Sequence, residues 1–322
     1  MSKVYNVGII GCGDFLRWQA DSIKNSKRTK VKSLFDPVKK RAEFFAEALG
    51  GEAKDSEDEI LTDPEIQMVY LFVPPWIRKG LVEKAAKNGK HILTTKPLGA
   101  TIDDCNAMKT ACEGNVDCGV IYRRTGGAIF ELYKKIFESG EIGKLALYKQ
   151  DWLHHYPEWN TWALDPAKNG GPFMDAMIHN MNIATYLMGE KPSKTYFFSD
   201  NHAHPEIACA DTEFMKLDYG TGRSAHLFIT WAADLAVYSK DGNDREHIDI
   251  TYMITDKGWR LTDSDGVITA SKDGKTKTWK VEDMEKTTMD EYVEYLEGES
   301  AWPSDLPTIG EASDDIVLVR NV

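Results

Sequence analysis

The sequence predicts an α/β protein in which a doubly wound parallel sheet is followed by an α+β domain with an open, mostly antiparallel sheet. Over residues 1–121, short apolar runs rich in β-branched side chains alternate with segments of helical periodicity. Beyond Pro192, strand-like runs follow one another and are separated by glycine-containing turns. A length of 322 residues also favours two domains. We therefore expect one domain at 1–121 and a second at 122–322.

The stretch from Val4 to Leu16 predicts a strand, a tight glycine turn and a helix, as in a Rossmann unit. There the first glycine makes the turn, the next lets the backbone approach a diphosphate, and the helix directs its N–H groups at the anion. Leu16 replaces the third small residue of G-x-G-x-x-G. The residues expected to contact a cofactor are Gly11, Cys12, Gly13, Asp14 and Phe15. A plain turn remains an alternative, as does the S-adenosylmethionine motif of methyltransferases, which GCGD also resembles.

An acidic residue follows the second predicted strand, Val31–Phe35. Asp36 has the place of the carboxylate that accepts a ribose hydroxyl in NAD-binding units. A carboxylate there repels a 2′-phosphate, which favours NAD, although the basic residues at 39–41 leave NADP open. Alternatively, Asp36 only begins a helix over residues 37–49.

Polar and turn residues also follow the next predicted strands, Met68–Val73 and His91–Thr94, with helices ending at Gly89 and Cys112 and a further strand at Cys118–Ile121. Ligands of parallel sheets bind beyond the carboxyl ends of the strands. We therefore expect the cofactor to bind at one edge of the sheet. Besides the glycine turn and Asp36, the residues predicted to contact it there are Pro74, Pro75 and Lys96.

The composition limits the classes of partner and location. A formal net charge of −12 argues against binding to nucleic acid or to an anionic membrane. No apolar run approaches the ~18 residues of a membrane span, and the N-terminal apolar run is the first strand rather than a signal peptide. The 5 cysteines include no C-x-x-C pair, so we expect free thiols in a cytoplasmic protein and no zinc site.

The second half begins with a predicted helix at Ala128–Glu138 and a strand at Lys144–Trp152, followed by an aromatic loop from His154 to Gly171. Loops of this length are often functional, but tryptophans pinning a loop over a helix explain the pattern equally well. The loop residues singled out are His154, His155, Tyr156, Trp159 and Trp162.

The segment from Gly170 to His179 opens a helix on which Asp175 and His179 are four residues apart, on the same face. A carboxylate at that spacing can orient an imidazole. The alternative is an ordinary helix-start Asp with a surface His. A metal site formed by His154, His155, Asp175 and His179 is disfavoured, because adjacent residues of an extended segment point to opposite sides.

The strand-rich part predicts an open sheet on which the preceding helices pack, and then two final helices, at Thr288–Leu296 and Ile309–Val319. The alternation of apolar residues from Ala225 to Trp231 is compatible with association through a free sheet face. The predicted strands are Thr195–Phe198, Thr212–Leu217, Ser224–Trp231, Ile248–Ile254, Val267–Ala270 and Thr276–Val281, with turns at 219–222, 241–243 and 272–274.

The chain resembles the glucose–fructose oxidoreductase, inositol dehydrogenase and MocA family. The matching segments are VGIIGCGD, FDPVKKRAE, DPEIQMVYLFVPP, NGKHILTTKPLG, IYRR, ESGEIGK and NGGPFMDAMIH. It departs from the family pattern in four places, with Thr95 for a Glu, Arg78 for a His, Met177 for a Gly and Asn182 for an Asp.

The resemblance implies an NAD(P)-dependent oxidoreductase acting on a sugar, polyol or inositol-like substrate, and association as a homodimer or homotetramer through the second sheet. The implied catalytic residues are Lys96, Asp175 and His179. Tyr122, Arg123 and Trp162 join them as expected substrate contacts. For hydride transfer, His179 would take the hydroxyl proton, Asp175 would fix its ring, and Lys96 would stabilise the alkoxide. A non-catalytic regulator that keeps the nucleotide and sugar sites is the alternative.

Overall fold

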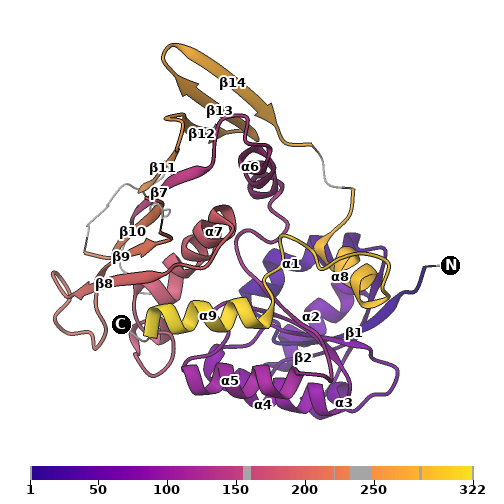
Figure 1. Cartoon of the computed structure of the whole chain (residues 1–322). Coiled ribbons are helices and arrows are strands. Elements are labelled where there is room, and N and C mark those ends of the chain that lie inside the picture. Colours follow the sequence, from indigo (N-terminus) through magenta and orange to yellow (C-terminus); the bar gives the residue numbers. More distant parts are fainter. Residues whose placement is uncertain (1, 155–160, 221, 233–247, 283–284, 321–322) are drawn as a thin grey trace, which may run out of the picture. The chain divides into compact units, whose positions relative to one another are not determined.

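The computed structural model describes residues 2–154, 161–220, 222–232, 248–282 and 285–320. The chain forms two compact units (Figure 1). The first unit comprises residues 1–126 and 284–316, and the second comprises residues 127–283 and 317–322. Each unit is built around its own sheet.

The first unit contains, within its described residues, a six-stranded sheet of order β3-β2-β1-β4-β5-β6 in which every neighbouring pair is parallel. Its strands are β1 (Tyr5–Ile10), β2 (Thr29–Phe35), β3 (Glu52–Ala53), β4 (Met68–Leu71), β5 (His91–Thr95) and β6 (Cys118–Ile121). The connecting helices are α1 (Asp14–Asn25), α2 (Lys39–Leu49), α3 (Glu57–Leu61), α4 (Pro75–Lys87) and α5 (Ile102–Cys112). The predicted doubly wound parallel sheet is confirmed.

The core of this unit follows from strands that are apolar on both faces. All residues of β4 and β6 are buried, as expected where helices cover both sides of a parallel sheet. On α1, only the stripe facing the sheet is buried, including Leu16 and Ile23. Leu16 is 0% exposed, so the residue that replaces the usual small one is a core residue here.

A late segment of the chain completes the first unit. Helix α8 (Thr288–Leu296) begins beside the α1–β2 connection, where one carboxylate oxygen of Asp290 accepts hydrogen bonds from the Ser26 hydroxyl (2.7 Å) and the backbone N–H groups of Lys27 (2.7 Å) and Arg28 (2.8 Å). The Arg28 guanidinium also binds both carboxylate oxygens of Glu299. These contacts explain why residues 284–316 pack with the first unit, although the sequence-based division assigned them to a domain at 122–322.

The second unit contains an eight-stranded sheet in the part of it that is described, of order β14-β13-β12-β11-β7-β10-β9-β8. Its pairs are antiparallel except for β7 with β10, which confirms the predicted open, mostly antiparallel sheet. The strands are β7 (Leu145–Leu153), β8 (Lys194–Asp200), β9 (Thr212–Asp218), β10 (Ser224–Thr230), β11 (Ile248–Thr255), β12 (Arg260–Ser264), β13 (Val267–Lys272) and β14 (Lys275–Lys280). The other elements are α6 (Ala128–Ser139), η1 (Thr161–Leu164), η2 (Phe173–Met177), α7 (Ile178–Met188) and α9 (Ile309–Arg320), which begins in the first unit.

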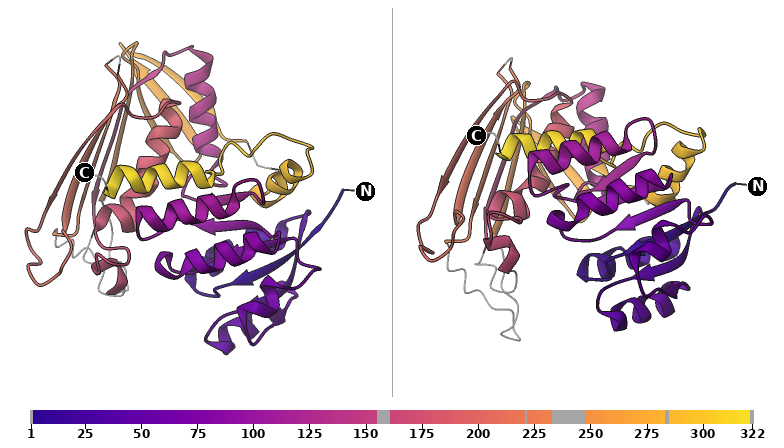
Figure 2. Two further views of the ribbon diagram at one scale, coloured as in Figure 1. Left: turned by 60° about the horizontal axis from the view of Figure 1, so that its bottom comes forward. Right: turned by 90° about the horizontal axis from the view of Figure 1, so that it is seen from below.

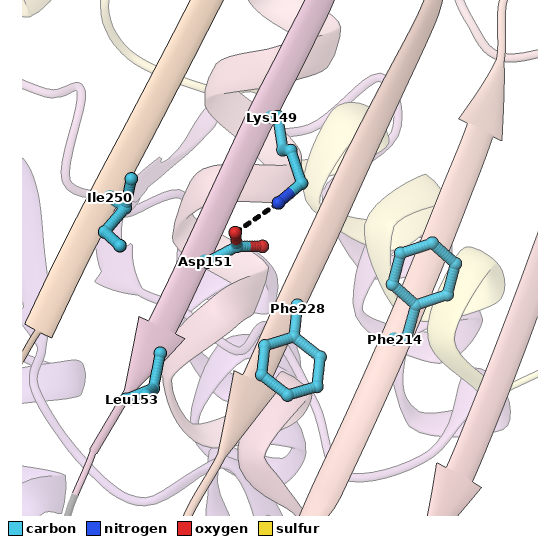
Figure 3. Close-up of a pocket in the computed structure, with 6 residues that line it drawn as sticks. All are labelled: Lys149, Asp151, Leu153, Phe214, Phe228 and Ile250. Atoms are coloured by element: carbon cyan, nitrogen blue, oxygen red, sulfur yellow. Dashed lines mark hydrogen bonds and ion pairs between the residues drawn. The ribbon is translucent and has the colours of Figure 1, made fainter.

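The two faces of this second sheet differ in chemistry. Helices α6 and α7 lie on the same face, as the views in Figure 2 show, and the inward side chains of β7 there, such as Tyr148 and Trp152, are buried. The opposite face carries a shallow depression of about 370 Å³ (Figure 3). Its lining residues are Lys149, Asp151, Leu153, Phe214, Phe228 and Ile250, and Lys149 forms an ion pair with Asp151.

Several elements differ from the sequence prediction. Strands β3 and β12 and helix α3 were not predicted, because they are short and largely polar, so neither periodicity is visible in them. Helix α2 begins at Lys39 rather than at residue 37. The predicted turn at 241–243 lies outside the described residues. No helix in the described part of the chain is long and apolar enough to cross a membrane.

We expect Asp290→Ala to lower the free energy of unfolding by about 2–3 kcal/mol, because it leaves the buried Arg28 N–H, the part-buried Lys27 N–H and the Ser26 hydroxyl without their acceptor. Urea denaturation followed by tryptophan fluorescence measures this change. The matched control is Asp21→Ala, which removes an exposed carboxylate from α1. Equal stability of the two variants would show that the α8 contact does not hold the first unit together.

Candidate functional site

The glycine turn after β1 requires a glycine at position 11 and leaves open space at position 13. Gly11 has a φ of +96°, and a Cβ there would lie 2.3 Å from the carbonyl oxygen of Phe72. Gly13 is the N-cap of α1, and a Cβ there would meet no atom within 4 Å. The backbone at the start of α1 is therefore open to a ligand, which is the space that a diphosphate needs.

Asp36 lies at the carboxyl end of β2 and ties that end to the glycine turn. One of its carboxylate oxygens accepts from the Cys12 N–H (2.9 Å) and the other from the Val38 N–H (2.8 Å). The N-cap of α2 is Val38, and the contact with its N–H is also what a residue that only begins this helix would make, so both interpretations of Asp36 stay open. The position after β2 agrees with the predicted ribose contact.

The ends of β4 and β5 supply the remaining predicted cofactor residues. Pro74 is the N-cap of α4 and Pro75 its first residue, a position where a missing N–H costs nothing. Lys96 follows β5, its N–H donates to the Ile121 carbonyl (3.1 Å), and its peptide bond to Pro97 is cis. The Lys96 side chain is half-buried. All the predicted cofactor residues therefore lie at the carboxyl edge of one parallel sheet.

The predicted substrate residues after β6 differ in exposure. Tyr122 is buried, and burial together with the nearby Asp315 carboxylate raises the pKa of its phenol well above the usual value. Arg123 is exposed. Both follow the last strand of the sheet at the same edge as Lys96, and their substrate contacts remain a prediction.

In the second unit, Asp175 and His179 lie on a helix whose first turn is wider than expected. The segment Phe173–Met177 is a π-helix that continues directly into α7, so Asp175 is in the wide turn and His179 in the α-helix. Such turns are rare and are frequent at functional sites. Both side chains are half-buried, and the Asn169 amide donates to the Asp175 carboxylate (3.2 Å).

Asn169 and Glu213 support this helix start, and the sequence analysis missed both. Asn169 is 0% exposed. Glu213 on β9 is 7% exposed, and its carboxylate accepts from the Phe173 N–H (2.6 Å), which is the first available donor after Pro172. The one available sequence pattern was the alternation of β9, which places Glu213 on the same face as the buried Met215 and Leu217.

The electrostatics of Glu213 are unusual for a carboxylate. Burial raises the pKa of Glu213 to about 7, while the backbone hydrogen bond from Phe173, the positive charge of Arg320 on α9 and the Ser199 hydroxyl oppose this change. Glu213 therefore exchanges a proton in the neutral range, directly beneath the helix that carries Asp175 and His179.

The aromatic loop before this helix is described only in part. Trp162 is half-buried in η1. The His154 ring stacks on Trp152 with 4.6 Å between ring centroids, and its Nε2 lies 3.2 Å from the Asp249 carboxylate. His155, Tyr156 and Trp159 lie outside the described residues. Among the residues that are described, no group of three or more His, Cys, Asp or Glu side chains is arranged to hold a metal ion.

A parallel sheet whose carboxyl edge combines an open glycine turn, a carboxylate after the second strand and a Lys–Pro turn defines a dinucleotide-binding α/β protein with a second α+β domain. Two models of one family match this chain. The oxidoreductase family with an NAD-binding Rossmann fold matches residues 5–121, and the GFO/IDH/MocA C-terminal domain matches residues 130–246. The chain belongs to the Gfo/Idh/MocA oxidoreductase family, and its first unit is an NAD-binding Rossmann domain. The predicted family and cofactor class are confirmed, and the methyltransferase alternative is wrong.

Relatives and solved structures agree with this assignment. The chain is 33% identical over 197 residues to scyllo-inositol 2-dehydrogenase (NAD+) of Bacillus subtilis, covering 59% of this chain and 55% of the relative. It is 24% identical over 196 residues to 1,5-anhydro-D-fructose reductase of Ensifer adhaerens, covering 60% of this chain and 59% of the relative. A levoglucosan dehydrogenase solved with NADH and levoglucosan shares the fold at 17% identity, with a TM-score of 0.78 over 98% of this chain and 95% of that one. The chain therefore aligns with little more than half the length of these two curated relatives.

We expect the stability of the protein to fall as the pH rises from about 5 to 8, in part because of Glu213. Its folded pKa of about 7 exceeds the ordinary value of 4.5, so the folded state holds a proton that the unfolded state has lost. This stabilisation amounts to up to about 3 kcal/mol. It is complete when the pH is below the ordinary pKa, and it is lost as the pH rises through the pKa of the folded state.

Glu213→Gln keeps an oxygen that can accept from Phe173 and removes the titration, so it should flatten this pH dependence. Denaturant unfolding measured across that pH range tests it. Glu282→Gln, at an exposed site in the second unit, is the matched control and should leave the slope unchanged. An unaltered slope in the Glu213 variant would show that its carboxyl does not titrate there.

Proposed function

We propose that this protein transfers a hydride between NAD and a secondary alcohol or ketone of a sugar, polyol or inositol-like substrate. The observation that carries the proposal is the Lys96–Pro97 turn at the carboxyl edge of an NAD-binding domain, in a chain that also holds Asp175 and His179 on one helix. The named relatives favour this substrate class, because they act on an inositol and an anhydro sugar. The solved neighbour that holds levoglucosan with NADH supports the same chemistry.

The residues of the first unit fit NAD. The open space above Gly13 and the free N–H groups of α1 suit the diphosphate, and the Asp36 carboxylate suits a ribose hydroxyl while repelling the 2′-phosphate of NADP. The full set proposed to hold the cofactor is Gly11, Cys12, Gly13, Asp14, Phe15, Asp36, Pro74, Pro75 and Lys96. When bound, the nicotinamide supplies the hydride acceptor or donor.

Three side chains of this protein are proposed to transfer the hydroxyl proton of the substrate and to stabilise the charge on its oxygen. We assign proton transfer at the substrate hydroxyl to His179, whose ordinary pKa of about 6.5 suits exchange near neutral pH. Asp175 would orient the imidazole and stabilise its protonated form, and Asn169 holds Asp175 in place. The Lys96 ammonium would stabilise the negative charge that develops on the substrate oxygen. Tyr122, Arg123 and Trp162 are proposed to complete the substrate contacts.

We also propose that the protein is a homodimer or homotetramer that associates through the free face of the second sheet. This face exposes large apolar side chains on β8 and on β11, and the strand register places them on the same side of the sheet as the residues that line the depression in Figure 3. They are Tyr196, Phe198, Ile248, Ile250 and Tyr252, which are 38% to 61% exposed.

The free state of all 5 cysteines supports a reducing, cytoplasmic location.

The activity is tested by incubating the protein with NAD and a panel of sugars, anhydro sugars, inositols and linear polyols while following the absorbance of the reduced cofactor. We expect turnover with members of the cyclic polyol or sugar classes. Binding of NAD and sugar without turnover of any member would favour the regulator instead.

With a turned-over substrate, Lys96→Met and His179→Ala should each lower kcat by about 10²- to 10⁴-fold, because each removes charge or proton transfer from the reacting oxygen. NAD binding, measured by calorimetry, should persist. Lys87→Met and His202→Ala change exposed residues of the same types and should keep full activity. Full activity in either catalytic variant would contradict its assignment.

The assembly is tested by sedimentation velocity. Replacing Phe198 with Asp should shift the protein to smaller species, with a dissociation constant raised about tenfold or more, because it places a charge on a buried apolar interface. Phe44→Asp is the matched control, since Phe44 is as exposed (63%) as Phe198 (61%) but lies on α2. Dissociation of both variants, or of neither, would argue against the sheet face.

A further inference from the structure

The first unit buries a cationic side chain, that of Arg78, which has no role in the proposed hydride transfer. Arg78 lies in the first turn of α4 and is 1% exposed, which makes it one of the largest fully buried side chains of the protein. Arginine is rarely buried without a carboxylate partner, because taking its charge out of water is costly. Arg78 is also one of the positions at which the sequence departs from the family pattern, which commonly has a histidine there.

Backbone carbonyls hold the Arg78 guanidinium in place. One of its terminal nitrogens donates to the Leu98 carbonyl (2.9 Å) and to the Pro97 carbonyl, and the other donates to the Val73 carbonyl (2.5 Å). Val73 follows β4, whereas Pro97 and Leu98 directly follow Lys96. Arg78 therefore joins the end of β4 to the Lys96 turn, at the edge of the sheet where the cofactor residues lie.

The charge of Arg78 is not neutralised nearby. In the part of the chain that the structure describes, no carboxylate contacts it, and its Nε has no hydrogen-bond partner. Burial lowers the pKa of Arg78 only to about 10, so it remains a cation at neutral pH. The ionisable groups that face it are Cys105, Cys118 and Tyr122.

These three facing groups are neutral at pH 7. Burial raises the pKa of the Cys105 thiol to about 12 and that of the Tyr122 phenol well above its usual value. The hydrogen bond with Cys112, together with burial, raises the pKa of Cys118 in the same direction. The positive end of α4, in whose first turn Arg78 lies, adds to the field rather than opposing it.

We infer that the fixed charge of Arg78 makes this site favour NADH over NAD+, so that Arg78 sets the preference between the two redox forms of the cofactor. This rests on the proposed function in one respect, the binding of the nicotinamide beside Lys96. The nicotinamide ring is a cation in NAD+ and neutral in NADH, so a nearby positive charge weakens the binding of the oxidised form alone. At an effective dielectric constant of about 20, a unit charge near the ring is expected to change the affinity by a factor on the order of tenfold.

The test compares two substitutions of Arg78 that both lose its planar fork but differ in charge. Arg78→Lys keeps the cation, and Arg78→Gln removes it. Dissociation constants for NAD+ and NADH are measured on each purified protein by calorimetry and by the fluorescence of the reduced cofactor. The readout is the ratio of the two dissociation constants. A loosened Lys96 turn would weaken the binding of both cofactor forms, whereas the charge changes the ratio of their constants.

We expect the ratio of the NAD+ constant to the NADH constant to fall by about tenfold in Arg78→Gln and to stay within about twofold of wild type in Arg78→Lys. An unchanged ratio in Arg78→Gln, with both forms still bound, would overturn the inference while leaving the proposed function intact. If the wild-type protein bound neither form, both the proposed function and this inference would fail.

A second pair of variants keeps the contacts of Arg78, in case its replacement prevents folding. Thr95→Glu places a carboxylate at the last residue of β5, directly before Lys96, and Thr95→Gln is its neutral control. The carboxylate should lower the ratio in the same direction as Arg78→Gln, relative to the amide. Equal ratios for the two Thr95 variants would refute a role for charge at this edge of the sheet, and with it the inference, whether or not Arg78→Gln folds.

Discussion

The pairing of β1 with β2 on one side and with β4 on the other is the constraint on which the candidate site depends. The Gly11 N–H donates to the Phe35 carbonyl, and the Phe72 N–H donates to the Ile10 carbonyl, so three strands end together. Their approach is so close that a Cβ on Gly11 would overlap the Phe72 carbonyl. Because the backbone determines this edge of the sheet, it also determines the positions of three parts of the candidate site, namely the start of α1, Asp36 and the start of α4. Asp36 and Arg78 then link neighbouring strand ends through side-chain bonds to the backbone.

How much of the fold and of the candidate site could be predicted from the sequence depends on how far apart in the chain the interacting residues are. The glycine turn, the helix Ile102–Cys112 and the strand Cys118–Ile121 follow from local periodicity and turn residues, and the structure has them at the predicted bounds. Family motifs led to Lys96, Asp175 and His179. The π-turn at Phe173 could not be predicted, because an α-helix and a π-helix require nearly the same local sequence.

The residues that support the site were less visible, because their partners are distant in the chain. Glu213 binds a backbone group 40 positions away, and Asp290 one that is 262 positions away. No local pattern marks such a contact. A charged residue on an apolar face is a hint, as for Glu213 on β9, but a single sequence does not tell what it touches. Arg78 was noticed only as a departure from the family pattern, and its burial became apparent only in three dimensions.

The two units each bury an ionisable group beside a residue proposed to act in catalysis. Arg78 is held by carbonyl oxygens next to the Lys96 turn, and Glu213 by an N–H group at the start of the helix with Asp175 and His179. Such groups lower the stability of a fold unless their polar atoms are satisfied, and backbone atoms of turns and helix ends supply most of the partners here. A rigid backbone around a buried charge also keeps the neighbouring catalytic side chain in one position.

The return of residues 284–316 to the first unit has a consequence for biosynthesis. The Rossmann unit is interrupted in the chain by the second unit, and Asp290 and Glu299 are partners of residues 26–28. A ribosome adds roughly 5–20 residues per second, so the α1–β2 connection emerges many seconds before α8 exists. During that interval the nascent sheet is exposed where α8 will later cover it, and residues 127–283 of the second unit are synthesised before the last part of the first unit.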